Sequence, residues 1–238
     1  DDEFSDIAQH LNALYHHLEV LIQQKYELTI RQQQAQMDML SAQLNPHFLY
    51  NTLDCMKWLG VANHVPQIAD MSTDLAALLR AGISGSELIP LEDELELVRQ
   101  YLNIQEIRFE DRFVCEIDVD ERYQHCIVPK MVLQPLVENA VEHDITANRG
   151  GDLWVRAYRQ TDKVVLEVEH DGTLTQEDRQ KIQSLLAQSV QGAAAGGQVG
   201  LRNVSQRLNL IYGDEGTLTL DQTRAGTVLA RVAIPAGQ

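Results

Sequence analysis

The stretch LNPHFLYN, residues 44–51, places a histidine and an asparagine at a spacing that could support chemistry. A neutral imidazole is a nucleophile near pH 7, so His47 is a candidate catalytic residue. Asn51 follows at i+4, one helical turn later, and its amide can therefore face the same side as the ring and orient it. The alternative for His47 taken alone is a histidine that packs beside apolar residues with its hydrogen bonds satisfied.

A second stretch, LQPLVENAVEH at residues 133–143, offers ligands for a divalent cation. Glu138 and Asn139 supply a carboxylate and an amide oxygen, which are hard donors suited to Mg²⁺. His143 lies one turn after Asn139, where an imidazole can reach phosphate oxygens. The alternative is a solvated helix face.

A third stretch, GGQVGLRNVSQRLNLIYG at residues 196–213, places three glycines before a helix that starts near Leu201. Gly196, Gly197 and Gly200 let the backbone approach an anion, and the free N–H groups of a helix N-terminus bind phosphate. The small residues that precede them, QSVQGAAAGG, are suited to a mobile lid.

Composition excludes several classes of protein. The net charge of −16 at pH 7 argues against nucleic acid as a partner, because phosphate binding needs clustered Lys and Arg. No run of about 18 apolar residues is present that could span a membrane. Cys55, Cys115 and Cys126 are widely spaced, which favours reduced cysteines without a disulfide or zinc role. The start, DDEFSD, carries no signal pattern and is typical of a piece cut from a longer protein.

The first 42 residues predict a coiled coil. Apolar residues recur at alternating steps of four and three, interrupted only at Lys25 and Gln32, and this seam favours a parallel homodimer. The alternative is an amphipathic helix packed on its own domain. Pro46 falls on the next seam position, where it is expected to bend or loosen the helix before His47 at a cost of roughly 3 kcal/mol.

The remaining elements fall into two groups. Helices are predicted at 66–83 and 90–112, and the first of these forms a hairpin with the histidine-bearing helix, so that two hairpins would make a four-helix bundle. From residue 112 onward five short alternating stretches predict strands, with helices at 132–143 and 200–213 between them. The five stretches are 113–120, 151–158, 163–170, 216–222 and 226–235. This pattern indicates an α/β domain with mixed or antiparallel strands and a boundary near residues 110–112.

The histidine segment closely resembles the phospho-acceptor box of the LytS/YesM-like sensor histidine kinases. Residues 43–51 match without interruption, and Tyr101, Leu102, Ile104, Arg108 and Phe109 match a later helix of that family. The resemblance implies that His47 is phosphorylated. Asn51 would then orient either the ring or a dephosphorylating water. A helix-end salt bridge is the alternative for Arg108.

The second and third stretches resemble the nucleotide motifs of the GHKL ATPases. On that resemblance Asn139 ligates Mg²⁺, Glu138 orders the water shell of the ion, and His143 contacts phosphate. Asp144 stands where the family usually has glycine, and it would either repel the triphosphate or point to solvent. The glycine motif matches at Gly200, Leu201, Asn203, Val204, Arg207 and Leu208. Thr227, in AGTVLARVAIP, would face the adenine.

The adenine pocket departs from the family pattern, Asp-Asn-Gly-x-Gly. Aligned on Gly172, His170 takes the place of the Asp that accepts the adenine amino hydrogens, Asp171 takes the place of the Asn, and Leu174 takes that of the second Gly. A neutral imidazole can accept one hydrogen bond, but a charged one accepts none. Asp171 could substitute only if the strand shifted, because adjacent strand residues face opposite sides.

The resemblance therefore implies a multidomain protein. Its N-terminal coiled-coil and helical-hairpin dimerisation bundle precedes an α/β two-layer sandwich, a GHKL-type ATP-binding domain. We expect a HAMP remnant and signalling coiled coil at 1–34, dimerisation and phosphotransfer helices at 35–110, and the catalytic domain at 111–238. DDEFSDIAQHLNAL resembles the second helix of a HAMP domain.

The function that follows is autophosphorylation from Mg-ATP and transfer to a response regulator. The protein would be a homodimer and the cytoplasmic part of a membrane-anchored bacterial receptor, joined to an upstream transmembrane sensor segment. A degenerate kinase with weak or absent ATP binding, acting as a scaffold or as a response-regulator phosphatase, remains the alternative because of His170. A clamp ATPase without a phospho-histidine would leave the motif around His47 unexplained.

Overall fold

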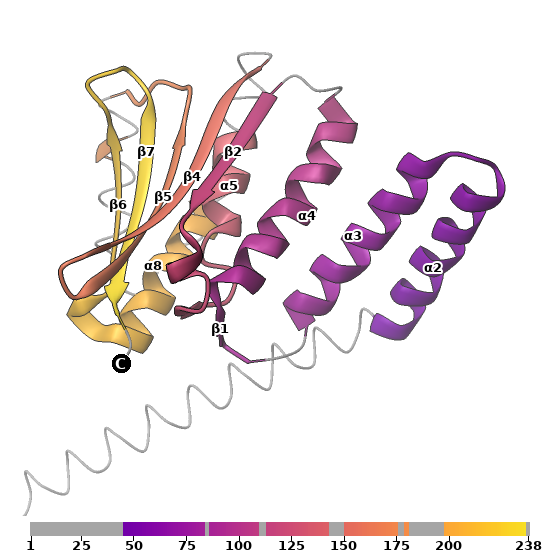
Figure 1. Ribbon diagram of the computed structural model, residues 1–238, viewed down its shortest axis with the longest axis horizontal. Helices are drawn as coiled ribbons and strands as arrows, with labels where there is room; N and C mark the ends of the chain where they lie inside the picture. The colour runs from indigo at the N-terminus through magenta and orange to yellow at the C-terminus, as the bar shows by residue number, and fades with distance from the viewer. Residues whose placement is uncertain are drawn as a thin grey trace, which may run out of the picture. The chain divides into compact units, whose positions relative to one another are not determined.

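The computed structural model describes residues 45–83, 86–109, 113–142, 150–175, 179–180 and 198–236 (Figure 1). The chain divides into two compact units, residues 1–52 and 53–238. The predicted HAMP remnant and coiled coil lie outside the described residues. Within the described part of the chain, no helix is long and apolar enough to cross a membrane.

The first described helix, α2, spans Pro46–Ala62 and corrects the expectation for Pro46. Asn45 has a φ of +42°, outside the helical range, so Pro46 is the first residue of a helix and not an interior kink. Proline is well tolerated there, because the missing N–H would have no partner within the helix. The Asn45 side chain accepts a hydrogen bond from the Phe48 N–H at 3.2 Å, as an N-cap residue does.

The hairpin predicted after the histidine helix is confirmed within the second unit. Helix α3 spans Pro66–Ile83, and a short turn joins it to the end of α2. Gly60 lies at this turn, where an added Cβ would come within 2.9 Å of the Ala69 backbone nitrogen. Only glycine allows the two backbones to approach so closely. The next helix, α4, spans Leu91–Phe109 and contacts α3 through a hydrogen bond from Asn103 to Asp74.

Five strands form one mixed sheet, and all five lie where the sequence predicts them. Their order is β2-β4-β5-β7-β6, with β2 parallel to β4 and the other pairs antiparallel. The strands are β2 (Phe113–Val119), β4 (Gly151–Gln160), β5 (Lys163–His170), β6 (Thr217–Gln222) and β7 (Val228–Pro235). Helices α5 (Gln134–Ala140) and α8 (Gln198–Tyr212) pack against one face of it, which gives two layers. Two short 3-10 helices, Glu121–Tyr123 and Gly213–Glu215, precede β3 and β6 respectively.

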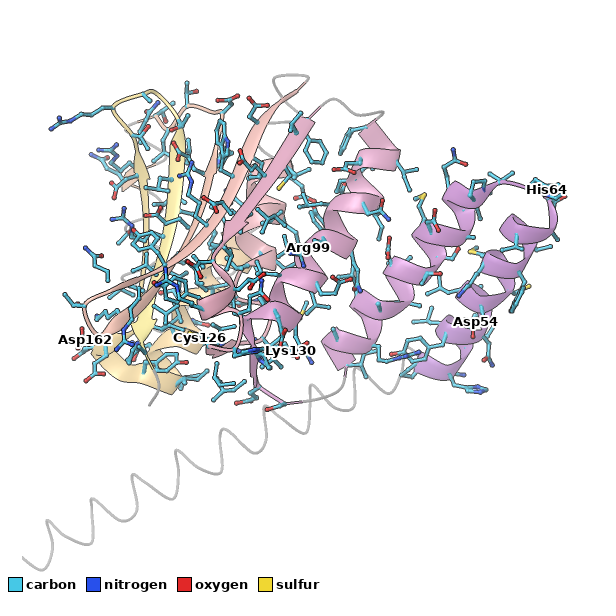
Figure 2. The ribbon with its side chains drawn as sticks, in the orientation of Figure 1. Asp54, His64, Arg99, Cys126, Lys130 and Asp162 are labelled. Atoms are coloured by element: carbon cyan, nitrogen blue, oxygen red, sulfur yellow. The ribbon has the colours of Figure 1, made fainter. Side chains whose placement is uncertain are left out.

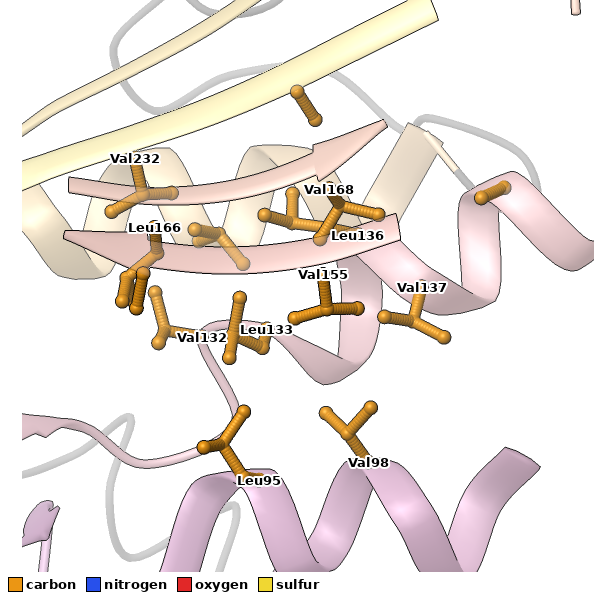
Figure 3. Close-up of a cluster of buried hydrophobic side chains, with 14 of the residues drawn as sticks. Leu95, Val98, Val132, Leu133, Leu136, Val137, Val155, Leu166, Val168 and Val232 are labelled. Atoms are coloured by element: carbon orange, nitrogen blue, oxygen red, sulfur yellow. The ribbon is translucent and has the colours of Figure 1, made fainter. Parts of the chain in front are cut away.

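The two faces of the sheet differ because alternate residues of a strand point to opposite sides. Val155, Leu166, Val168 and Val232 are buried on the face that the helices cover, and Figure 3 shows them in one cluster with Leu136 of α5. The other face carries polar side chains from the intervening positions. There Arg156 pairs with Glu169 at 2.6 Å, and Arg231 and Tyr158 both donate to Glu167.

Helix α4 belongs to the same core as the sheet. Leu95 and Val98 pack beside the apolar residues of α5 (Figure 3). A small second sheet reinforces the contact, because β1 (Leu88–Pro90) pairs antiparallel with β3 (Ile127–Pro129) immediately before α4 begins. Packing therefore continues across residue 110, where the sequence predicts the boundary between the phosphotransfer helices and the catalytic domain.

Candidate functional site

His47 lies at the second position of α2, and its side chain is exposed to solvent. The Asn51 amide nitrogen lies 3.3 Å from each of the two ring nitrogens, as the i+4 spacing predicts. The amide N–H can donate only to the ring nitrogen that carries a lone pair. If the amide is rotated by 180°, its oxygen can instead accept a hydrogen bond from the ring N–H. Because the amide nitrogen is equally far from the two ring nitrogens, Asn51 can hold the ring in either tautomer of the imidazole.

The start of α2 also favours negative charge beside His47. The first N–H groups of a helix have no partner within it, and the helix dipole is positive at this end. The N–H groups of Phe48 and Leu49 already bond to the Asn45 carbonyl at 3.0 and 3.2 Å, so the attraction for an anion beside His47 comes from the helix dipole and not from these two donors. A phosphoryl group on the imidazole would add its charge at a helix end whose dipole attracts anions.

The candidate cation ligands, Glu138 and Asn139, lie next to each other in α5 and are both half-buried. Gln134 donates to Glu138 at 2.8 Å. Burial raises the pKa of Glu138, and the negative charge of Glu142 adds to the rise. A half-buried carboxylate beside an amide oxygen fits the hard-donor preference of Mg²⁺, so these residues suit the ion that the sequence predicts.

Helix α8 brings the glycine motif to α5. An added Cβ at Gly200 would lie 3.2 Å from the Cβ of Pro135, so a larger residue here would press against the first turn of α5. Leu201 is buried in the core and Asn203 is exposed. Arg207 donates to the backbone carbonyl of Lys130, which Figure 2 labels. The structure thus places the described parts of the two motifs, residues 133–142 and 198–213, side by side.

His170 ends β5 on the face that the helices cover, where 1% of its surface is exposed. It lies between Leu153 and Val228 of the neighbouring strands, and its Nδ1 is 3.4 Å from the Asp171 carbonyl. Asp171 is exposed, and its carboxylate accepts a hydrogen bond from the Asp152 N–H at 3.0 Å. Because β5 keeps its regular register up to His170, the Asp171 carboxylate does not take the buried position.

Gly172 and Leu174 follow the end of β5, and the structure places Gly172 in the interior while Leu174 packs against the core. Thr227 comes to the other face of the sheet. Its hydroxyl donates to Glu169 at 2.6 Å, and Glu169 points away from the face that holds His170. Burial raises the pKa of Glu169, but hydrogen bonds from Thr227 and Arg156 outweigh it and lower the pKa. The structure therefore does not bring the Thr227 hydroxyl to His170, and its contact with adenine stays a prediction.

Several predicted residues cannot be placed. His143, Asp144, Gly196 and Gly197 lie outside the described residues. Their assignments to phosphate and to the lid stay predictions.

Glu94 of α4 was not among the candidates from the sequence. It is fully buried, and its two carboxylate oxygens accept hydrogen bonds from the Met131 and Leu133 N–H groups at 2.7 and 2.8 Å. A signal was present, because Glu94 falls on the apolar stripe that Leu91, Leu95 and Val98 define. A carboxylate in such a stripe indicates a buried partner on another element.

Comparison with known proteins gives two family matches. Residues 35–113 match the histidine kinase family, and residues 127–238 match the family of histidine kinase-, DNA gyrase B- and HSP90-like ATPases. The chain is 31% identical over 215 residues to the sensor histidine kinase YesM of Bacillus subtilis, covering 90% of this chain and 35% of that protein. It is 30% identical over 197 residues to the sensor histidine kinase/phosphatase LytS of Staphylococcus aureus, covering 81% of this chain and 33% of that protein.

The chain therefore spans about a third of the length of these two relatives. Among solved structures, the histidine kinase domain of the Erythrobacter litoralis EL346 blue-light activated histidine kinase is 15% identical, with a TM-score of 0.48. It covers 81% of this chain and 94% of that chain.

Proposed function

Because the chain belongs to the family of sensor histidine kinases that includes YesM and LytS, we propose that it transfers the γ-phosphoryl group of ATP to its own His47 and then to an aspartate of a response regulator. The observation that carries this proposal is the exposed His47, paired with Asn51 at the start of a helix. A nucleophile that must meet both a nucleotide and a partner protein has to be accessible to each in turn.

The first transfer needs a ring nitrogen with a free lone pair. That nitrogen forms a bond to the γ-phosphorus while the bond from phosphorus to the leaving ADP oxygen breaks, and the ring then loses the proton from its other nitrogen. Asn51 supports this step when its amide oxygen accepts the ring N–H, since the opposite nitrogen is then free to attack. In the second transfer the aspartate of the regulator takes the phosphoryl group.

The nucleotide is proposed to bind between α5, the start of α8 and the end of β5. Glu138 and Asn139 would hold Mg²⁺, which when bound neutralises charge on the phosphates. The close approach of Gly200 to Pro135 supports a shared site for the two motifs. The remaining proposed contacts are those that the family resemblance assigns: His143, His170, Asp171, Gly172, Leu201, Asn203, Arg207 and Thr227.

The partners follow from the family and from the surface. Met56 and Leu59 of α2, and Ile68 and Leu75 of α3, are large apolar residues that are 42–57% exposed. An apolar surface of this kind on a helical hairpin supports homodimerisation into a four-helix bundle. We further propose that a transmembrane sensor segment precedes this cytoplasmic portion and that a receiver domain docks near His47.

A second function is favoured by one observation, the buried imidazole of His170 where the family has a carboxylate. If ATP binds weakly for this reason, the protein acts as a scaffold or as a phosphatase of its response regulator. Asn51 supports the phosphatase, because an exposed amide beside His47 can orient an attacking water.

Labelled ATP tests the kinase. We expect the wild-type protein with Mg²⁺ to acquire acid-labile label, and His47→Gln to acquire none. Equal labelling of the two proteins would refute His47 as the acceptor. No label on the wild type, together with no Mg-ATP binding at millimolar nucleotide in calorimetry, would favour the second function.

A further inference from the structure

Glu94 has no role in the reaction proposed above, yet it is the most buried carboxylate among the described residues, with 0% of its surface exposed. Its partners are backbone N–H groups of the segment between β3 and α5, at Met131 and Leu133. Burial raises the pKa of Glu94, and the backbone donors oppose that rise. Each of the two oxygens accepts from an N–H group, and these donors favour the charged form of the carboxyl group.

The segment that Glu94 holds needs such support. Met131 has a φ of +56°, in the left-handed region that residues with a side chain rarely adopt. Leu133, the residue before α5, has no side chain that can cap the helix. The carboxylate of Glu94 takes the place of a cap, since it satisfies N–H groups at the start of α5 from a different helix.

Arg207 holds the same segment from the opposite direction. Its guanidinium, on α8, donates to the Lys130 carbonyl, while Glu94, on α4, accepts from the next N–H along the chain. Residues 130–133 are therefore fixed between α4 and α8. Since α5 follows directly, its first turn, which contacts Gly200, is placed by these bonds.

We propose that Glu94 is a positioning residue that, together with Arg207, sets where α5 presents Glu138 and Asn139 to the nucleotide. The positioning of α5 is inferred from the hydrogen bonds of Glu94, and its effect on nucleotide binding rests on the proposed kinase function. Helix α4 also contacts α3 through Asn103 and Asp74, so the same helix joins the hairpin to the segment that Glu94 holds. The hairpin that follows the phosphorylated histidine would thus bias nucleotide binding.

The test compares Glu94→Gln with Glu96→Gln. The amide of the first variant keeps the size of the side chain, but its NH₂ group faces one of the two backbone N–H donors. Glu96 is the matched control, because it lies two residues away on α4 and its side chain is 58% exposed. In Glu94→Gln we expect hydrogen exchange of the Met131, Leu133 and α5 amides to quicken about tenfold relative to β5 amides, with Glu96→Gln unchanged.

Nucleotide binding provides a second readout. If α5 is correctly placed in only a tenth of the Glu94→Gln molecules, the apparent Kd for Mg-ATP rises about tenfold, since affinity falls by the fraction that is competent. The KM for ATP in autophosphorylation should rise similarly, whereas kcat at saturating ATP is retained. Where wild-type affinity is too low to measure, the same pair is compared in a His170→Asp background.

If Glu94→Gln does not fold, Arg207→Lys tests whether the bonds to residues 130–133 position α5. Lysine keeps the charge but cannot reproduce the planar guanidinium, so the Met131 and Leu133 amides should again exchange faster than β5. Equal exchange in Glu94→Gln and Glu96→Gln would overturn the proposal, as would an equal acceleration in α5 and β5. If the exchange pattern appears but neither background binds Mg-ATP, the kinase proposal fails and the positioning of α5 by Glu94 stands.

Discussion

Replacing His170 by aspartate is expected to strengthen Mg-ATP binding. His170 is 1% exposed at the end of β5, so an adenine that reached it would meet a side chain shielded from water. The adenine amino group is a donor, and a carboxylate accepts from it more strongly than a neutral imidazole does. A hydrogen bond to a charged partner contributes about 1.5–3 kcal/mol. If the imidazole of the wild type makes no bond to adenine, the whole of this energy is gained, and because 1.4 kcal/mol is a factor of ten, the affinity rises about 10–100-fold.

The same substitution is expected to weaken the protein without nucleotide. A carboxylate between Leu153 and Val228 loses its contact with water and, without nucleotide, gains no bond to adenine, which destabilises the folded protein. Calorimetry should therefore give a lower Kd for Mg-ATP, and thermal unfolding should give a lower Tm for His170→Asp alone and a larger rise on adding Mg-ATP.

His170→Asn is the matched control, since it has nearly the size of aspartate and a neutral acceptor oxygen. It should fall between the wild type and His170→Asp in affinity. The reasoning is refuted if His170→Asp is folded, as judged by circular dichroism, and its Kd for Mg-ATP equals that of the wild type. In that case adenine does not contact the end of β5.

Three further outcomes are expected. Lowering the pH from 7 towards 5 should weaken Mg-dependent ATP binding in calorimetry, because the raised pKa of Glu138 protonates this carboxylate earlier than an ordinary one; Glu138→Gln should flatten that dependence. Asn51→Ala should slow autophosphorylation about tenfold in a labelled-ATP assay, because no amide then orients the imidazole, while the Kd for Mg-ATP stays unchanged. Leu75→Lys should shift the protein from dimer to monomer in sedimentation, with unaltered circular dichroism, since it puts charge into the exposed apolar face of α3.

Local patterns predict the parts of this structure that local forces determine. The pairing of His47 with Asn51 follows from helical periodicity alone, and the five strands follow from alternation and turn residues. Pro46 was harder, because a proline on a continuing apolar seam fits either a kink or a helix start. The φ of Asn45 decides between them, and a backbone angle leaves little trace in residue types.

Contacts between distant segments were not predictable in the same way. Glu94 and Met131 are 37 residues apart in the sequence. Because every residue except proline has a backbone N–H, the residue type at position 131 does not indicate that it bonds to Glu94. Thr227 illustrates the same limit, since the resemblance places it near adenine while strand register turns its hydroxyl towards Glu169. The register of β5 and β7 is a property of the whole sheet, which a motif does not encode.

The polar face of the sheet affects how readily another protein surface could bind to this domain. Arg156, Glu169, Arg231 and Glu167 are paired with one another across β4, β5 and β7. A partner that covered these pairs would remove their water without offering better bonds, and this desolvation costs several kcal/mol per ion. The face is therefore a poor surface for a permanent interface, which fits the proposed kinase, because its nucleotide-binding domain would have to approach His47 and withdraw again.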